Sequence, residues 1–337
     1  MRTTLKIVIA CILLTHADCG FSQDIHFSQF FEAPLLRNPS LAGIYTGDLR
    51  IQAVYRDQWN SVTNAYKTGS LNGEYKMPIG KGDDFMTIGM QILFDRAGTI
   101  GWTSIHALPA INYHKSLSTD HNSYLSLGFM GGIVQRSFDV SKITTNSQYD
   151  GTGIGENLGN TQYTYLDGSV GMSYNSSLGD NSDNNFFIGA AYHHFNRPNN
   201  SFYRDPNIEL QPKWVFSGGL RFNAGDYAFI TLQADHSRQG AFSETIGGAT
   251  YGLKIGPNPD QPDYVLHAGS YLRWNDAFVP VVKLDYLPFS FALSYDVNIS
   301  KLKPSSYGRG GFEFSLSYIG FLNRERSTLN STLCPRF

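Results

Sequence analysis

The chain has 337 residues and a formal net charge of −2, and 16% of its residues are charged, whereas 14% are aromatic. This balance speaks against nucleic acid as a partner, because a polyanion is bound by a strongly basic surface. The charged fraction is also well below the roughly 25% of an ordinary soluble domain. Few charges, many aromatic residues and 34 glycines are typical of strands with one face toward lipid and one toward water.

Residues 1–22 predict an export signal. An apolar core from Ile7 to Leu14 follows a charged start, and Gly20 and Ser22 provide a small-x-small cleavage site, so we expect the mature chain to begin near Gln23. The core is too short to span a membrane, and no later stretch approaches the ~18 apolar residues of a spanning helix. A membrane location would therefore require a closed barrel of strands.

The segment 23–47, which follows the predicted signal, does not have the pattern of a strand. It contains Pro34 and Pro39 and ends in Gly47, and these residue types interrupt strands. We expect this N-terminal segment either to fill the lumen of a barrel or to lie against its periplasmic rim.

From residue 48 to residue 320, apolar and polar side chains alternate in one segment after another. In FSFALSYDVNIS, residues 289–300, an apolar side chain occupies every second position, as in a strand with one apolar face. In a soluble sheet that face is the core, whereas in an outer-membrane barrel it faces lipid and the polar face lines the lumen. The composition favours the barrel. Similar patterns predict about fourteen strands, at residues 48–57, 66–76, 85–95, 102–115, 123–137, 163–176, 185–195, 213–223, 227–237, 242–255, 263–273, 277–286, 288–299 and 310–320.

The predicted connections differ in length according to their order along the chain. The odd connections include the long segments 138–162, 196–212 and 300–309. The even connections include the short segments 223–226, 257–262 and 286–289. Short periplasmic turns and longer outer loops are typical of outer-membrane barrels. We therefore predict an all-β protein, a transmembrane antiparallel β-barrel of the outer membrane over residues 48–320, with a C-terminal periplasmic tail at 321–337.

No motif of a known catalytic or cofactor site is present. The chain has no G-x-S-x-G, HExxH, paired CxxC or P-loop sequence. His193 and His194 are neighbours in a predicted strand, so they point to opposite faces and cannot hold one metal ion together. The stretch 180–185 lacks the glycine and the bidentate glutamate of a calcium loop. We expect no enzyme activity, no cofactor and no metal.

Two regions carry candidate partner contacts. The long loops hold tyrosines and charged residues, the mixture found at protein interfaces. The tail follows the last strand, and it contains NRER, which suits charge-assisted contacts, and CPRF, with the one cysteine that remains after the signal. The alternative roles of the tail are to seal the lower mouth of the barrel or to form a disulfide with a partner. The candidate contacts are Tyr149, Asp150, Arg197, Tyr203 and Arg204 in the loops, and Arg324, Arg326, Cys334, Pro335, Arg336 and Phe337 in the tail.

Five stretches, in this order along the chain, carry a family likeness: HFSQFFEAPLLRNPSLAG, YRDQW, YDVNIS, GRGGFEFSLSYIG and CPRF. Together they resemble the PorP/SprF family of Bacteroidota outer-membrane proteins, which belong to the type IX secretion system and the gliding machinery. The resemblance covers nearly the whole mature chain. It implies structural roles for the motif residues Asn38, Pro39, Gly43, Tyr55, Arg56, Gln58, Trp59, Tyr295, Asp296, Gly308, Gly310, Gly311 and Glu313.

The resemblance implies a non-enzymatic barrel that assists the export or the cell-surface anchoring of proteins with a type IX C-terminal sorting domain. The implied partners are outer-membrane lipid, such a secreted or surface protein, and a periplasmic peptidoglycan-associated protein. Two other functions are compatible with a barrel: a channel for solute uptake and a membrane-embedded hydrolase. The predicted lumenal positions form no clear solute filter and no catalytic triad can be named, so the first function is favoured.

Overall fold

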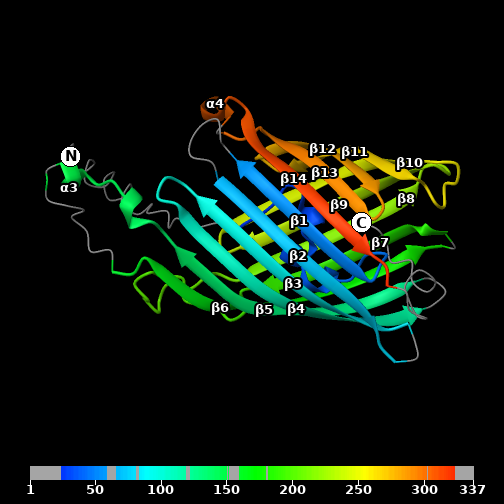
Figure 1. The fold of residues 1–337 in the computed structure, drawn as a ribbon, viewed down its shortest axis with the longest axis horizontal. Helices are drawn as coiled ribbons and strands as arrows, with labels where there is room; N and C mark the ends of the chain where they lie inside the picture. The colour runs from blue at the N-terminus through cyan, green and yellow to red at the C-terminus, as the bar shows by residue number, and fades with distance from the viewer. Residues whose placement is uncertain are drawn as a thin grey trace, which may run out of the picture.

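The computed structural model describes residues 24–58, 66–80, 83–118, 122–149, 151, 159–179, 181–301 and 303–322. The predicted export signal and most of the predicted tail lie outside these residues. In the described part of the chain, fourteen strands form one closed antiparallel barrel, in which consecutive strands pair and β1 closes on β14 (Figure 1). The prediction of an all-β transmembrane barrel is confirmed.

Every strand expected from the alternation is present, and the observed bounds differ from the expected ones by a few residues at most. The strands are β1 (Leu49–Gln58), β2 (Tyr66–Pro78), β3 (Phe85–Ala97), β4 (Trp102–Ser118), β5 (Ser123–Ser137), β6 (Gln162–Leu178), β7 (Asn181–His193), β8 (Lys213–Asn223), β9 (Ala228–Gln239), β10 (Phe242–Ile255), β11 (Tyr264–Arg273), β12 (Ala277–Tyr286), β13 (Phe289–Asn298) and β14 (Arg309–Gly320). The helices are short: η1 (Phe30–Glu32), α2 (Pro34–Arg37), η2 (Pro39–Leu41), η3 (Val140–Lys142), α3 (Asn146–Tyr149) and α4 (Lys303–Ser306). No described helix is long and apolar enough to cross a membrane.

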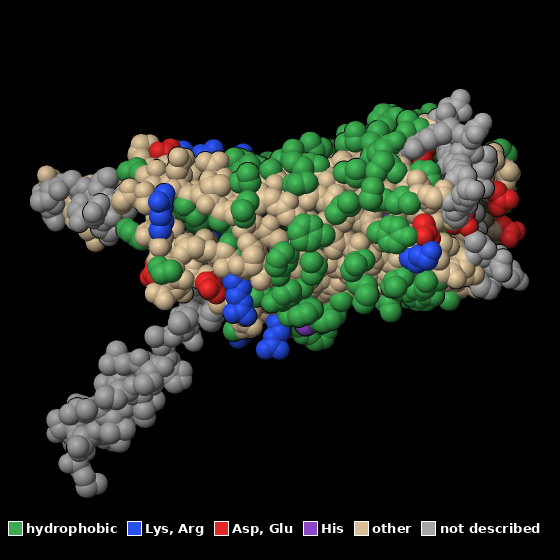
Figure 2. Space-filling model, turned by 90° about the horizontal axis from the view of Figure 1, so that it is seen from below, with side chains coloured by type: hydrophobic (Ala, Val, Ile, Leu, Met, Phe, Trp, Pro, Cys, Tyr) green, Lys and Arg blue, Asp and Glu red, His purple; other side chains and the backbone are tan. Residues whose placement is uncertain are grey.

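The apolar face of the wall points outward. On β13, Phe291 and Leu293 are exposed, whereas Ala292 between them and Ser294 and Asp296 after them are buried. Figure 2 shows hydrophobic side chains over the middle of the barrel wall and charged side chains toward its two ends. A lipid-facing apolar band with polar ends is the outer surface that a membrane barrel needs. The period-two pattern of 289–300 therefore has its apolar face toward lipid.

The long connections lie at one end of the barrel. Because consecutive strands run in opposite directions, the β5–β6, β7–β8 and β13–β14 connections share one end, where α3 and α4 are found (Figure 1). We call this the long-loop end. The opposite, short-turn end holds tight connections such as Leu287–Pro288 between β12 and β13. The structure thus has the segregation of connection lengths that the sequence indicated.

The segment Asp24–Asp48 lies inside the barrel, and we call it the plug. At the long-loop end, Asp24 Oδ2 lies 3.3 Å from Lys213 Nζ, at the start of β8. At the short-turn end, Asp48 donates its N–H to Gly320 O at 2.9 Å and accepts from Lys76 N at 2.8 Å. The plug therefore runs along the lumen from one end of the barrel toward the other before it enters β1.

Candidate functional site

Three of the sequence stretches that carry the family likeness meet on the inner wall. Arg56 of β1 lies between the carboxylates of Asp296 on β13, at 3.0 Å, and Glu313 on β14, at 3.3 Å. Arg273 of β11 adds a second guanidinium, 2.8 Å from Asp296. All four side chains are buried. Two arginines against two carboxylates balance in formal charge, which is the condition under which buried charges are tolerated.

This four-residue cluster holds the plug by its main chain. The Glu313 carboxylate accepts hydrogen bonds from the backbone N–H groups of Ser28 and Gln29, both at 2.7 Å. Arg56 Nη1 donates to His26 O at 2.8 Å, and Arg273 Nη1 donates to Ser28 Oγ at 2.8 Å. Hydrogen bonds to charged groups are the strong ones. The cluster therefore fixes residues 26–29 of the plug against the β1, β11, β13 and β14 wall.

A bulge in β14 lies opposite Asp296. Between the pairs Tyr295–Phe312 and Val297–Arg309, the single residue Asp296 on β13 faces two residues, Gly310 and Gly311, on β14. A Cβ at Gly310 would overlap the Asp296 carbonyl oxygen, so the bulge requires glycine at this position. A bulge bends the strand that carries the extra residue, while Asp296 keeps the inward alternation of Ser294 on β13. This geometry accounts for the motif glycine Gly310, and Gly308, with φ +73°, supplies the left-handed turn before β14.

The RNPSLAG stretch forms the part of the plug that packs most closely on the wall. Asn38 separates α2 from η2; its side chain accepts hydrogen bonds from Ser40 N at 2.9 Å and Ser40 Oγ at 2.7 Å, which caps η2. Its amide nitrogen donates to the wall carbonyls of Met172 at 3.3 Å and Ala190 at 3.2 Å. Pro39 occupies the first turn of η2, where its missing N–H is not needed.

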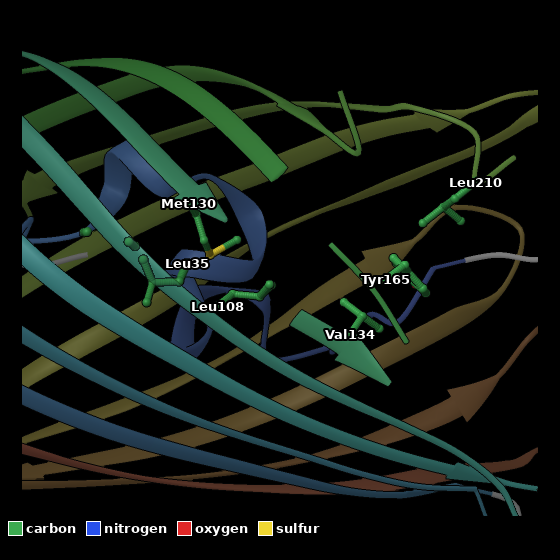
Figure 3. Close-up of a cluster of buried hydrophobic side chains, with 8 residues drawn as sticks. Leu35, Leu108, Met130, Val134, Tyr165 and Leu210 are labelled. Atoms are coloured by element: carbon green, nitrogen blue, oxygen red, sulfur yellow. The ribbon is translucent and has the colours of Figure 1, made fainter. Parts of the chain in front are cut away.

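Glycines on the wall make room for this stretch. A Cβ at Gly128 on β5 would lie 2.5 Å from Pro39 C, and a Cβ at Gly171 on β6 would overlap Asn38 Oδ1. Beside them, Leu35 packs with the wall residues Leu108 and Met130 (Figure 3). The plug therefore contacts β4–β7 through main chain, small residues and one apolar cluster.

Further ion pairs join the plug to the wall, and one more lies between β1 and β2. The sequence analysis did not single out these residues. Arg37 donates to both carboxylate oxygens of Asp235 on β9, at 2.7 and 2.5 Å. Lys283 of β12 lies 2.7 Å from Glu32. On the wall itself, Arg50 donates to Glu74, whose other oxygen accepts from Gly43 N at 2.7 Å. The wall partners occupy inward positions of their strands. The sequence indicated these positions only through the alternation, which predicted that their side chains face the lumen.

The amino end of the plug is held by a histidine in the β7–β8 connection. His194 Nδ1 donates to Asp167 Oδ2 at 2.8 Å, and its Nε2 lies 3.5 Å from Asp24 Oδ2. Burial lowers the pKa of His194, but the hydrogen bond to Asp167 and the negative charges of Asp24 and Asp167 outweigh this and raise the pKa to about 9. A protonated imidazole between two carboxylates therefore completes the charge pairing at this end of the plug.

The other predicted site residues lie apart from the plug or outside the described residues. Tyr55 and Tyr295 point to the lipid side, and Gln58 lies at the rim of the long-loop end. Tyr149, Arg197, Tyr203 and Arg204 are exposed on the connections of the long-loop end, and they form no single cluster with the plug. Outside the described residues lie Trp59, Asp150, Arg324, Arg326, Cys334, Pro335, Arg336 and Phe337. Within the described part of the chain, no three His, Cys, Asp or Glu residues are grouped so that they could hold a metal ion.

A closed fourteen-stranded barrel with an apolar outer band and a polar, plugged lumen is an outer-membrane β-barrel. Residues 20–318 match the family described as type IX secretion system membrane protein PorP/SprF. The chain therefore belongs to the PorP/SprF family, as the motif stretches indicated. No curated protein matches the chain at a significant level.

Solved structures of other outer-membrane barrels are similar in fold. The toluene transporter TbuX of Ralstonia pickettii superimposes with a TM-score of 0.52 at 8% identity, over 86% of this chain and 94% of that one. The toluene transporter TodX of P. putida gives a TM-score of 0.50 at 10% identity, over 87% and 95% of the two chains. CdiB from Acinetobacter baumannii gives 0.47 at 10% identity, and this chain spans 60% of its length. At such low identity the likenesses to TbuX and TodX establish the barrel fold alone.

Proposed function

We propose that this barrel is a non-enzymatic part of the type IX secretion and gliding machinery that assists export, or anchors at the cell surface, a protein with a type IX C-terminal sorting domain. The observation that carries the proposal, beside the family, is the fixed plug. The plug contacts the barrel through Asp24, which lies near His194, at its amino end, through Asn38 in its middle, and through Asp48 at its carboxyl end. Because the plug fills the lumen, this barrel is better suited to binding a folded protein at its surface than to passing one through its lumen.

The surface that would receive the exported protein is the long-loop end. Tyr149 is 89% exposed and Tyr203 71% exposed, and Arg197 and Arg204 are exposed beside the latter in the β7–β8 connection. Tyrosine and arginine are enriched among residues that dominate binding energy at interfaces. Because longer loops face outward in such barrels, we assign this end to the outside of the cell.

The test is a pair of double variants in whole cells. Tyr203→Ala/Arg204→Ala should reduce co-purification of the surface protein with the barrel severalfold and lower its display at the cell surface. The matched control, Asn258→Ala/Asp260→Ala, lies in the β10–β11 connection at the short-turn end and should leave both unchanged. Equal losses in the two variants, with equal amounts of folded barrel, would contradict the assignment of the contact surface.

A periplasmic, peptidoglycan-associated partner is the second part of the proposal. β14 ends at the short-turn end, so the tail that follows Gly320 starts on the side we assign to the periplasm. The tail's proposed contacts are still Arg324, Arg326, Cys334, Pro335, Arg336 and Phe337, and the competing role is to seal the barrel mouth. Deleting Leu329 to Phe337 should leave a folded, surface-detectable barrel that no longer co-purifies with this partner. Failure of the truncated barrel to assemble would make the tail structural.

A further inference from the structure

The plug leaves space on one side of the lumen. Against β4–β7 the contact is close, as the glycines at 128 and 171 show. Against β8–β12 two internal cavities separate plug and wall, with about 50 and 70 Å³ of space for the centres of water molecules. A vestibule of about 890 Å³ opens beyond them at the long-loop end. A water molecule needs roughly 10–15 Å³ by this measure, so each internal cavity holds several.

The three spaces follow one another along the barrel. Glu244 of β10 lines both the vestibule and the first cavity, which continues along β9 past Ser237 and Asp235; we call it the Asp235 cavity. The second cavity lies further along the same strand, at Gln233 and Thr231, and we call it the Thr231 cavity. Alternate strand residues are about 6.6–6.8 Å apart along the strand. The vestibule, the Asp235 cavity and the Thr231 cavity therefore lie one after another along the barrel axis. The Thr231 cavity reaches Arg221, Val265 and Asp285, near the short-turn end.

Aromatic rings separate the two internal cavities. Phe30 and Phe31 of η1 lie on Tyr271 of β11, with ring centroids 5.2 Å apart in both pairs. Tyr271 donates a hydrogen bond to Gln233 Oε1 at 3.2 Å. Gly248 of β10 is paired with Tyr271. A Cβ added at Gly248 would overlap Ser270 O and lie 2.8 Å from the ring carbon Cδ1 of Tyr271, so the two strands approach closely at this point. We call these three rings the aromatic partition.

The spaces on both sides of the aromatic partition are lined by charges of both signs. The Asp235 cavity has Lys213, Asp235 and Glu244 in its lining, and the Thr231 cavity has Lys283 and Asp285. Charged linings keep water in a cavity, whereas an apolar constriction between wet spaces blocks ions by excluding water. Mixed charges give no strong preference for cations or anions.

We propose that this barrel has a further activity, the gated conduction of inorganic ions and water along its β8–β12 side, with the aromatic partition as the gate. Displacement of the rings of η1 joins the two cavities. The close contacts of Asn38 and Leu35 with β4–β7 are untouched by that motion, so the plug stays in place while the passage opens. The inference goes beyond the proposed anchoring function and does not depend on it.

Single-channel currents of the purified full-length protein in planar lipid bilayers with potassium chloride test the proposal. The wild-type barrel should be closed for most of the time. Phe31→Ala and Tyr271→Leu, one in the plug and one in the wall, should each give a severalfold increase in mean conductance. The matched control is Leu35→Ala, which also truncates an apolar side chain of the plug but on the β4–β7 side, away from both cavities. It should conduct like the wild type.

A second measurement, made in potassium nitrate because chloride precipitates silver, locates the path with silver ions, which bind thiolates. In Phe31→Ala carrying Cys334→Ser, silver should block the current when Thr231→Cys is present. It should not block when the cysteine replaces Thr87, a buried inward residue of β3 beside Gly43. An equal conductance increase in Leu35→Ala, or equal block at both cysteines, would show general loosening of the plug and overturn the proposal. Wild-type conductance in both ring variants, with the heat-dependent gel shift of a folded barrel, would overturn it as well.

Discussion

The two sides of the plug meet the barrel wall in different ways. On the β4–β7 side the contact is made by main chain and by Asn38, and the wall carries glycines where a Cβ would collide with the plug. On the β8–β12 side the contact is made by long charged side chains, such as Arg37 with Asp235, and by the aromatic partition, and cavities remain between them. Close steric contact leaves the plug backbone little freedom to move. Ion pairs between long side chains connect plug and wall while the two backbones stay apart, so space remains between them. One side therefore sets where the plug lies, and the other leaves cavities between plug and wall.

Gly128 offers the most direct test of the close contact between the plug and the β4–β7 side of the wall. In Gly128→Val, the new side chain would collide with Pro39 and Ser40, whose main-chain atoms lie 2.5 Å from an ideal Cβ. Overpacking costs about 1–3 kcal/mol where neighbours adjust, and here the neighbour is the backbone of η2, so we expect loss of the folded, plugged barrel. Heat-dependent gel mobility and protease access to the plug measure this. Gly73→Val, where nothing lies within 4 Å, is the control and should fold normally.

The ion pair on the other side should be replaceable as a unit. Arg37→Met leaves Asp235 buried without its partner, and breaking a buried pair costs about 3–5 kcal/mol. Arg37→Met combined with Asp235→Leu removes both charges and should regain most of this stability. Urea unfolding of the barrel in detergent gives the three free energies. If the double variant is as unstable as the single one, this side also depends on specific geometry.

Asn38 has two functions on the β4–β7 side, the cap of η2 and the hydrogen bonds to the wall, and substitutions can separate them. Asn38→Ala removes the η2 cap and leaves the Met172 and Ala190 carbonyls without a donor, a loss of about 2–3 kcal/mol. Asn38→Asp keeps an acceptor for Ser40 but brings no amide donor to the two wall carbonyls. Its urea midpoint should be lowered too, and the plug should become more accessible to protease near η2. A neutral effect of Asn38→Ala would mean that the glycines alone position the plug.

The smallest expected effect is a local pH dependence at the amino end of the plug. The pKa of His194 is raised to about 9 by Asp167 and Asp24, so the protonated imidazole stabilises the folded state. This contribution is complete below the ordinary histidine pKa of about 6.5 and is lost as the pH rises through about 9. Hydrogen exchange of residues 24–30, corrected for intrinsic rates, should therefore increase from pH 7 to pH 10, while residues 38–44 change little. His194→Gln should abolish the pH dependence; an unchanged profile would exclude His194 as its source.

The strands could be predicted from the sequence because their cause is local. Lipid on one side and a polar lumen on the other impose a period of two on each strand, and the pattern in 289–300 or 242–255 shows it without reference to any other residue. The plug has no such period, so the sequence did not distinguish a position in the lumen from one against the periplasmic rim. The motif residues Arg56, Asp296 and Glu313 were singled out through family likeness, but their meeting was not foreseen.

The alternation along the chain is enough to predict the barrel, its strand number, the outward face of each strand and the shared end of the long connections. The pairing of charges, and the places where the plug contacts the wall closely or leaves a cavity, follow only from the closed fold. Arg56 and Asp296 are 240 residues apart in the chain, and Arg273 joins them by a second ion pair to Asp296. Closure of the barrel brings such groups together, and buried charges are stable only with partners at hydrogen-bond distance, so pairing is a property of the closed fold and not of any local stretch.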